Sequence, residues 1–188
     1  LRVLCDEAGL LLMFDEVQCG VGRSGTLFAH EHYAIEPDVM AIAKGLGGGF
    51  PVGACLANEA VSSSMQFGSH GSTFGGNPLA MAVADAVLDL VLEPSLLKDV
   101  NSKASFLVKE LEALTIKYPQ SISSVHGLGL MLGVKCVGEN TKLLLELREH
   151  GLLVGKSGDN MIRLLPPLNV SQAELERALT LIETVLQN

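Results

Sequence analysis

The sequence has little or nothing of several features on which whole classes of protein depend. It contains no tryptophan, and aromatic residues make up only 4% of its 188 residues. Proteins that bind single-stranded nucleic acid stack the bases on aromatic side chains, which this chain barely offers. Basic residues are also few, with 13 lysines and arginines against 21 aspartates and glutamates. Because phosphate contacts need clustered positive charge, we expect no nucleic-acid partner.

Long hydrophobic runs and closely spaced cysteines are missing as well. The longest apolar run, residues 8–14, is far shorter than the ~20 residues that cross a bilayer, so we expect no membrane partner. Cys5, Cys19, Cys55 and Cys136 lie far apart and form no CxxC motif. This spacing disfavours a zinc site or a disulfide framework, and we expect reduced thiols, no metal and a cytoplasmic location.

The charged residues that are present are distributed unevenly. Up to residue 94 the chain holds 11 acidic and 3 basic residues, whereas the remainder holds 10 of each. Lys44 is the only lysine in the first half. We interpret the change as a boundary between two units, residues 1–93 and 94–188, because Pro94 indicates a helix boundary there.

Short apolar runs and helical spacings predict an α/β unit followed by a smaller α+β unit. The first two runs are continuous and read as buried, parallel strands. Asn77-Pro78 and the Ser171/Glu174 capping box are helix start signals. The expected elements are strands over residues 10–14, 38–43 and 52–57, helices over 78–90 and 97–114, a strand over 128–136, a helix over 141–150, strands over 152–155 and 161–165, and a final helix over 171–186. The apolar face expected on the first helix comprises Leu79, Ala82, Val83, Ala86, Val87 and Leu90.

Two of the predicted strands end in side chains of opposite charge, Asp15 and Lys44. Functional groups of open α/β sheets gather at the carboxyl ends of the strands. Lys44 precedes four glycines within five residues. It is either a solvated surface lysine or, if partly buried, a nucleophilic amine for Schiff-base chemistry. Asp15 is either an ordinary strand-end carboxylate or the partner of the pyridinium nitrogen of pyridoxal phosphate (PLP).

Three other motifs carry weaker signals. GVGRSG at residues 20–25 matches the GxGxxG dinucleotide fingerprint, but residues 15–19 separate it from the strand, so we do not predict a nicotinamide cofactor. His30 and His32 would face different ways on a helix, which disfavours a metal pair. Ser72 and Thr73 lie in a glycine-rich stretch that reads either as a phosphate-binding loop or as a plain connection.

The strings FDEVQCGVGRSGTLFAHEHYAIEPDVMAIAKGLGGGFPVGA and GSHGSTFGGNPLA resemble the class III (subgroup II, ornithine-type) PLP-dependent aminotransferases, and RLLPPL at 163–168 is again typical. The resemblance implies the type I fold of PLP-dependent transferases, with part of the large domain over 1–93, the small C-terminal α+β domain over 94–188, and a homodimer. Members of the family are about twice this length, so we expect a portion of a longer chain that starts inside the large domain.

The resemblance also implies a reaction. The chain would transfer the amino group of N2-acetylornithine to 2-oxoglutarate in arginine biosynthesis. Ornithine, succinylornithine and 4-aminobutyrate are alternative amino donors. A portion that lacks the phosphate-cradling loop would be inactive alone, and a non-catalytic remnant that only associates with a partner subunit is the alternative from another class.

The resemblance assigns cofactor-binding roles to residues near the two charged strand ends. Lys44 would hold PLP covalently and move the proton during transamination. Asp15 would pair with the pyridine nitrogen, and Gln18 would hydrogen-bond the phenolic oxygen of the ring. Glu16 and Val17, which lie between them, would complete the cofactor contacts.

Further roles fall on residues remote from those strand ends. Thr73 would reach the phosphate of the PLP held by the neighbouring subunit, and Ser72 would lie beside it near the substrate. Arg163 resembles the arginine that clamps a substrate carboxylate, a role that suits its two-pronged guanidinium. Cys19 stands where threonine is commoner in the family, beside the PLP contacts rather than among them.

Overall fold

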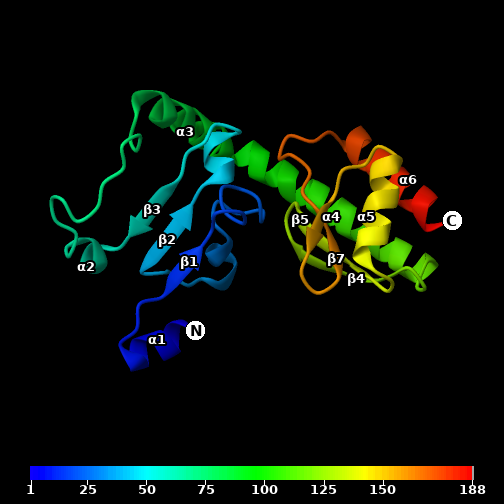
Figure 1. Cartoon of the computed structure of the whole chain (residues 1–188), viewed down its shortest axis with the longest axis horizontal. Coiled ribbons are helices and arrows are strands. Elements are labelled where there is room, and N and C mark those ends of the chain that lie inside the picture. The colour runs from blue at the N-terminus through cyan, green and yellow to red at the C-terminus, as the bar shows by residue number, and fades with distance from the viewer. Residues whose placement is uncertain (188) are drawn as a thin grey trace. The chain divides into compact units, whose positions relative to one another are not determined.

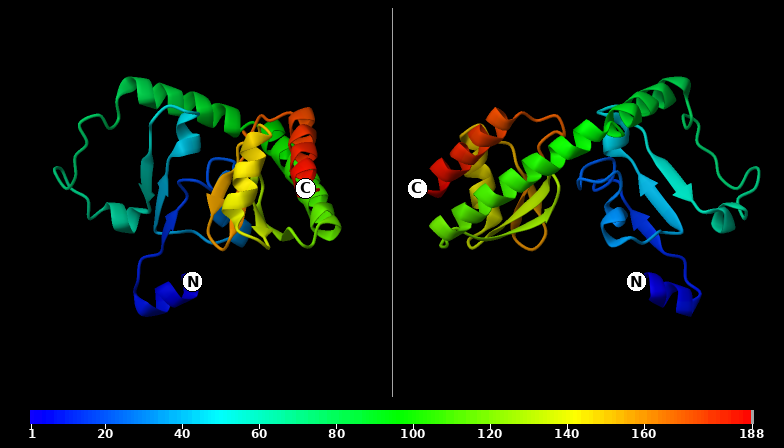
Figure 2. Two further views of the ribbon diagram at one scale, coloured as in Figure 1. Left: turned by 45° about the vertical axis from the view of Figure 1, so that its right-hand side comes forward. Right: turned by 180° about the vertical axis from the view of Figure 1, so that it is seen from behind.

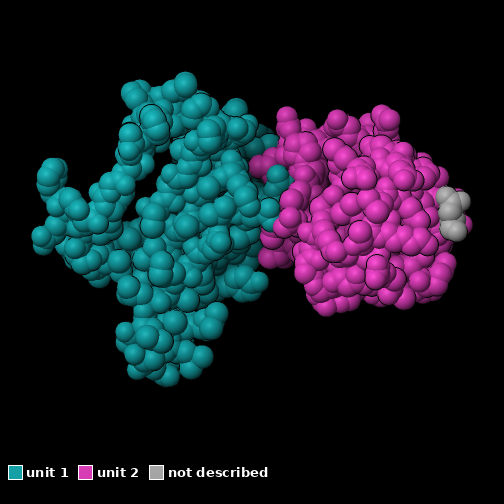
Figure 3. Space-filling model, in the orientation of Figure 1, with its two compact units in different colours: residues 1–97 teal, residues 98–188 magenta. Residues whose placement is uncertain are grey.

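The computed structural model of the chain describes residues 1–187. It contains two compact units, Leu1–Leu97 (unit 1) and Lys98–Asn188 (unit 2), which are coloured separately in Figure 3. The boundary between them lies inside a helix, α4 (Pro94–Lys117), that begins at a proline. Each unit has a sheet of its own.

Unit 1 is built around a three-stranded sheet with the order β1-β2-β3 (Figure 1). Strand β1 runs parallel to β2, and β3 runs antiparallel to it. The elements of unit 1 are α1 (Arg2–Ala8), β1 (Met13–Asp15), η1 (Ala29–Tyr33), β2 (Val39–Ile42), η2 (Lys44–Gly47), β3 (Ala54–Ala57), α2 (Glu59–Ser62) and α3 (Pro78–Val91).

The second predicted strand is confirmed, because β2 is buried along most of its length. The first prediction is only partly right. The strand is parallel to β2 as expected, but it covers residues 13–15 rather than 10–14, and Met13 is 67% exposed. Strand β1 is an edge strand of the sheet and pairs with β2 on one side only.

The predicted apolar face of α3 is not the face that unit 1 buries. Asn77 caps the helix as expected, with its side-chain oxygen accepting the N–H of Ala80 at 2.9 Å. The helix buries Ala80 and Ala84, whereas Leu79 and Leu90 are exposed. A helical repeat shows that a helix has an apolar face, but which side is covered depends on the neighbouring elements.

Unit 2 packs helices against a four-stranded antiparallel sheet with the order β4-β5-β7-β6. Its elements beyond α4 are β4 (Ile122–Leu128), β5 (Met131–Cys136), α5 (Asn140–Glu149), β6 (Gly155–Ser157), β7 (Met161–Leu164) and α6 (Gln172–Leu186). The helix expected over 97–114 is confirmed as α4, and its apolar residues at spacings of three and four are buried: Val100, Ala104, Leu107, Leu111 and Leu114. The capping box at the start of α6 is also confirmed.

Two strand predictions in unit 2 are only partly right. The single strand expected over residues 128–136 is the second half of a hairpin, because the chain turns at Gly129, which has φ +57°. The strand expected over 152–155 starts only at Gly155, as β6. In the part of the chain that the structure describes, none of the helices has both the length and the hydrophobicity needed to cross a membrane.

Candidate active site

The sheet of unit 1 brings Asp15 and Lys44 to the same edge. Strands β1 and β2 are parallel, and their register pairs Asp15 with Ala41. Lys44 lies three residues beyond Ala41, directly after β2 ends. Because the carboxyl ends of parallel strands meet at one edge, a carboxylate and a primary amine, both exposed, lie close together there.

A tight turn follows Asp15 and orients its carboxylate. One carboxylate oxygen of Asp15 accepts the backbone N–H of Val17 at 2.9 Å. The N–H of Gly20 in turn donates to the carbonyl of Glu16 at 3.0 Å. A Cβ at Gly20 would lie 2.8 Å from that carbonyl oxygen, so the turn requires glycine there. The half-buried Val17 and Gln18 occupy the middle of this turn.

Glu16 is the most deeply buried acidic residue of the site, with 2% of its surface exposed. Its carboxylate accepts the N–H groups of Ala29 at 2.8 Å and His30 at 2.9 Å, and it contacts the ring Nδ1 of His30 at 3.1 Å. The side chain therefore ties the end of β1 to the start of η1. These contacts support the edge of the sheet, and the cofactor contact expected for Glu16 stays a prediction.

The thiol of Cys19 lies beside the same buried carboxylate. Its Sγ is 3.6 Å from Glu16 Oε2 and 3.6 Å from the carbonyl oxygen of Asp15. Burial raises the pKa of the Cys19 thiol, and the negative charge of Glu16 raises it further. A thiol with a raised pKa stays protonated and is a poor nucleophile, so Cys19 contributes no nucleophile to this edge.

Lys44 occupies the first position of η2 with an unusual backbone, φ +45°. Its side chain is exposed, and within residues 1–187 no hydrogen bond or ion pair holds its amine. The backbone beneath it is fixed, since Leu46 donates its N–H to the carbonyl of Ala43 at 3.0 Å and is itself buried. The lysine thus combines a fixed backbone with an amine that is available to react.

The structure does not bring Ser72 and Thr73 to this edge within unit 1. Both are exposed in the connection between α2 and α3, which leaves the sheet on the side of β3 (Figures 1 and 2). The Ser72 hydroxyl accepts the N–H of Gly75 at 3.0 Å, which shapes the local turn.

Arg163 belongs to unit 2, on strand β7. Both of its cross-strand partners are glycines, Gly133 on β5 and Gly155 on β6. A Cβ on Gly155 would lie 3.5 Å from Arg163 Nε, so the guanidinium stem runs over the bare backbone of β6. The two glycines leave space for a large planar side chain at the centre of the sheet.

Comparison with known proteins decides the family. Residues 1–186 match the family described as Aminotransferase class-III. The acetylornithine aminotransferase of Mesorhizobium japonicum is 56% identical over 97% of this chain and 46% of its own length. The chain belongs to the class III aminotransferases. It spans a little under half the length of the relatives it matches.

Solved structures agree with this family assignment. The acetylornithine aminotransferase of Elizabethkingia anophelis is 37% identical, with a TM-score of 0.90 over 99% of this chain and 48% of that one. The ornithine aminotransferase of Toxoplasma gondii is 31% identical, with a TM-score of 0.91 over 99% of this chain and 45% of that one. The predicted type I transferase fold is therefore confirmed for the portion that the chain covers.

The residues at the sheet edge of this class III chain fit PLP. The cofactor carries an aldehyde, which needs an amine, and a pyridine nitrogen, which needs a carboxylate. Lys44 supplies an unpaired amine, and Asp15 supplies an exposed carboxylate at the same edge. No cluster of metal-ligating side chains occurs in the described part of the chain.

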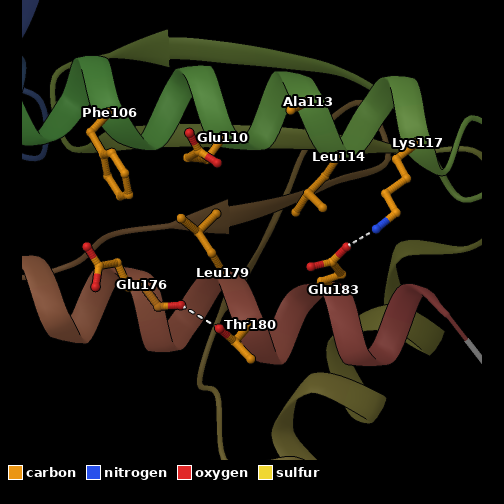
Figure 4. Close-up of a pocket in the computed structure, with 9 residues that line it drawn as sticks. All are labelled: Phe106, Glu110, Ala113, Leu114, Lys117, Glu176, Leu179, Thr180 and Glu183. Atoms are coloured by element: carbon orange, nitrogen blue, oxygen red, sulfur yellow. Dashed lines mark hydrogen bonds and ion pairs between the residues drawn. The ribbon is translucent and has the colours of Figure 1, made fainter.

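A hollow of about 380 Å³ lies elsewhere, between α4 and α6 of unit 2 (Figure 4). Phe106, Leu114 and Leu179 give it an apolar lining. At one end Lys117 Nζ lies 2.6 Å from Glu183 Oε1. None of the residues assigned from the sequence lines this hollow, so it is not part of the candidate site.

Sequence reasoning missed the supporting layer of the site. It treated His30 as a surface or internally bonded histidine without naming a partner, and the structure gives it Glu16. A local signal existed, because an acid directly after Asp15 at the end of a strand must point to the other face of the sheet. The sequence analysis also did not identify Val21, a buried residue of the turn after Asp15, as part of this layer.

Proposed function

We propose that this chain supplies the reactive lysine of a PLP-dependent aminotransferase that transfers the amino group of N2-acetylornithine to 2-oxoglutarate in arginine biosynthesis. The observation that carries the proposal is that Lys44 and Asp15 lie at the same edge of the sheet, where the parallel strands β1 and β2 end. The choice of donor is supported by the 56% identity to a protein named acetylornithine aminotransferase.

When bound, PLP supplies an electron sink that stabilises negative charge on the carbon next to the transferred nitrogen. Lys44 would hold the cofactor through Nζ and would accept and return a proton at the substrate carbon. The Asp15 carboxylate would keep a proton on the pyridine nitrogen through a charge-assisted hydrogen bond. Gln18 would orient the ring at its phenolic oxygen, with Val17 beside it.

The remaining assigned residues serve the substrate and a second subunit. In a cytoplasmic homodimer, Thr73 would contact the phosphate held by the partner subunit, and Ser72 would lie near the substrate. The exposure of both residues, away from the edge of their own unit, supports this arrangement. Arg163 would clamp a carboxylate of the 2-oxo acid, and the flanking glycines support that role.

Chemical trapping tests the proposal directly. The full-length protein, loaded with PLP, is reduced with borohydride, digested and mapped by mass spectrometry. We expect the cofactor on the peptide that contains Lys44. Label on Lys98 or on a later lysine, or no label at all, would overturn the assignment.

Ornithine is the second candidate donor, because the fold match to the ornithine aminotransferase of T. gondii is as good as the match to the acetylornithine enzyme. The ratio of kcat/KM for N2-acetylornithine to that for ornithine separates the two. We expect the ratio to exceed one, and succinylornithine and 4-aminobutyrate belong in the same assay.

A further inference from the structure

Val21 holds a backbone conformation that valine rarely adopts. Its φ is +53°, in the left-handed region where a branched side chain crowds the backbone. The side chain is nevertheless almost completely buried, with 1% exposed. Strain of this kind persists only where the surrounding structure enforces it, and it is concentrated at functional sites.

The turn that carries Val21 is anchored beside Asp15. On one side, the N–H of Gly20 donates to the carbonyl of Glu16 at 3.0 Å. On the other side, the N–H of Gly22 donates to the carbonyl of Leu27 at 3.1 Å. The buried Glu16 carboxylate then fixes the far end of the same loop. The loop therefore cannot move independently of the residue that follows Asp15.

The side chain of Val21 reaches the residue that follows Lys44. A Cβ placed on Gly45 would lie 3.3 Å from Val21 Cβ and 3.7 Å from Val21 Cγ1. The valine is thus packed against Gly45, and a methyl group at position 45 would fit only if Val21 moved by a few tenths of an ångström. Lys44, which precedes Gly45 in the chain, shares the left-handed conformation, with φ +45°, so a second strained residue lies next to this contact.

We propose that Val21 is a positioning residue for Lys44. The loop that begins beside Asp15 presses a buried valine against Gly45 and so fixes the spacing between the carboxylate and the amine. Val21 itself touches neither cofactor nor substrate in this proposal, which rests on the proposed role of Lys44. Because reacting groups lose rate steeply when displaced by about 1 Å, loss of the contact should impair the lysine without removing it.

A size swap in the full-length protein tests the contact. Val21→Gly removes the side chain and suits the left-handed backbone. Gly45→Ala adds a methyl group against Val21, at a position whose own φ lies outside the left-handed region. In the double variant, the methyl group at position 45 occupies space vacated at position 21.

The first readout is the rate at which Lys44 of the cofactor-free protein captures added PLP, followed by borohydride trapping and peptide mapping. The second is the split between kcat and KM in the loaded enzyme. We expect each single variant to slow capture and lower kcat roughly tenfold, with KM changed less than about twofold. The double variant should recover most of both losses, which a double-mutant cycle measures as coupling.

Val39→Ala is the matched control. It removes two methyl groups from another buried valine of unit 1, at the opposite end of β2 from Lys44. We expect it to lower thermal stability while leaving capture and kcat near wild type, and to combine additively with Gly45→Ala. If the glycine variant does not fold, Val21→Ala, which removes Cγ1 and Cγ2 but keeps Cβ, tests the losses of capture and kcat as a single variant.

The outcomes separate this inference from the proposed function. If wild-type Lys44 captures no PLP, the proposed function fails whatever the variants do. If wild-type Lys44 is labelled but the Val21 variants behave like Val39→Ala, the positioning role is overturned. Losses in the single variants that the swap does not recover would also overturn it, because they would not run through the contact with Gly45.

Discussion

The two units of this chain differ in how they hold their residues in place. Every member of the main hydrophobic cluster lies in unit 2, where Val100, Leu111 and Ile122 are completely buried. Unit 1 leaves large apolar side chains such as Met13 and Leu90 exposed. Yet unit 1 carries the reactive lysine. The comparison teaches that the candidate site is ordered by turns and hydrogen bonds around a buried carboxylate, whereas unit 2 is ordered by a packed core.

The largest expected effect concerns Lys44, because the proposed chemistry has no substitute for its amine. Lys44→Ala in the full-length protein should abolish borohydride trapping of PLP and reduce transamination to the background rate. The control is Lys98→Ala, which removes the next lysine along the chain and should leave both unchanged. Trapping that persists on another peptide of Lys44→Ala would show that the chemistry is not confined to unit 1.

Packing density should produce the next largest difference between the units. Leu111→Ala removes a side chain that is 0% exposed in unit 2, and it should lower the free energy of unfolding by about 2–5 kcal/mol. Leu90→Ala removes the same atoms from a residue that is 67% exposed in unit 1, and it should cost about 0.5 kcal/mol or less.

Urea denaturation followed by circular dichroism measures both values, since the chain has no tryptophan to report by fluorescence. Equal losses in the two variants would contradict the comparison, because they would show that Leu90 is covered in the protein in solution.

The helices α3 and α4 differ in how well the sequence predicts their buried faces. The buried face of α4 was predictable because its spacing of three and four residues meets a core within unit 2. The matching pattern on α3 pointed to Leu79 and Leu90, which are exposed, since a pattern does not identify the partner that covers it. Asp15 and Lys44 were predictable because charged residues at strand ends form a local signal.

Other features had no local signal. The first strand of the β4–β5 hairpin was not predicted, because β4 contains serine, histidine and glycine and no regular apolar pattern. Nothing in the sequence indicates that Val21 adopts the left-handed conformation in addition to Gly22, which follows it. The role inferred for Val21 depends on its contact with Gly45, which is more than twenty residues away in the sequence.

Substitutions of Arg163 test whether unit 2 contributes to the reaction through substrate binding alone. Arg163→Ala should leave PLP trapped on Lys44 and raise KM for 2-oxoglutarate roughly ten- to a hundredfold, the ~1.5–3 kcal/mol of a charge-assisted bidentate contact. Arg163→Lys keeps the charge without the planar fork and should fall between wild type and alanine. An unchanged KM for both substrates would assign the arginine a structural role.

The smallest expected effect concerns the helix caps. The cap of α6 in unit 2 contains the charged Glu174, whereas the cap of α3 in unit 1 is the neutral Asn77. At the start of α6, Glu174 Oε2 accepts the Ser171 backbone N–H at 2.8 Å and the Ser171 hydroxyl at 2.7 Å. The hydrogen bond from the Ser171 backbone N–H is the main cause that keeps the pKa of Glu174 below its ordinary value of 4.5, and the hydrogen bond from the Ser171 hydroxyl is the second cause. A lowered folded-state pKa stabilises the fold above the ordinary value, and this contribution is lost as the pH falls through the folded-state pKa.

Glu174→Gln keeps an acceptor in the capping box but removes the charge, so it should be less stable than wild type at pH 7. The difference should shrink as the pH falls below 4.5. Asn77→Ala is the neutral comparison: it removes the cap of α3, should cost about 1 kcal/mol, and should show no such pH dependence. Denaturation curves between pH 7 and pH 3 measure both differences. A gap between wild type and Glu174→Gln that stays constant over this range would mean that the charge of Glu174 does not contribute to the cap of α6.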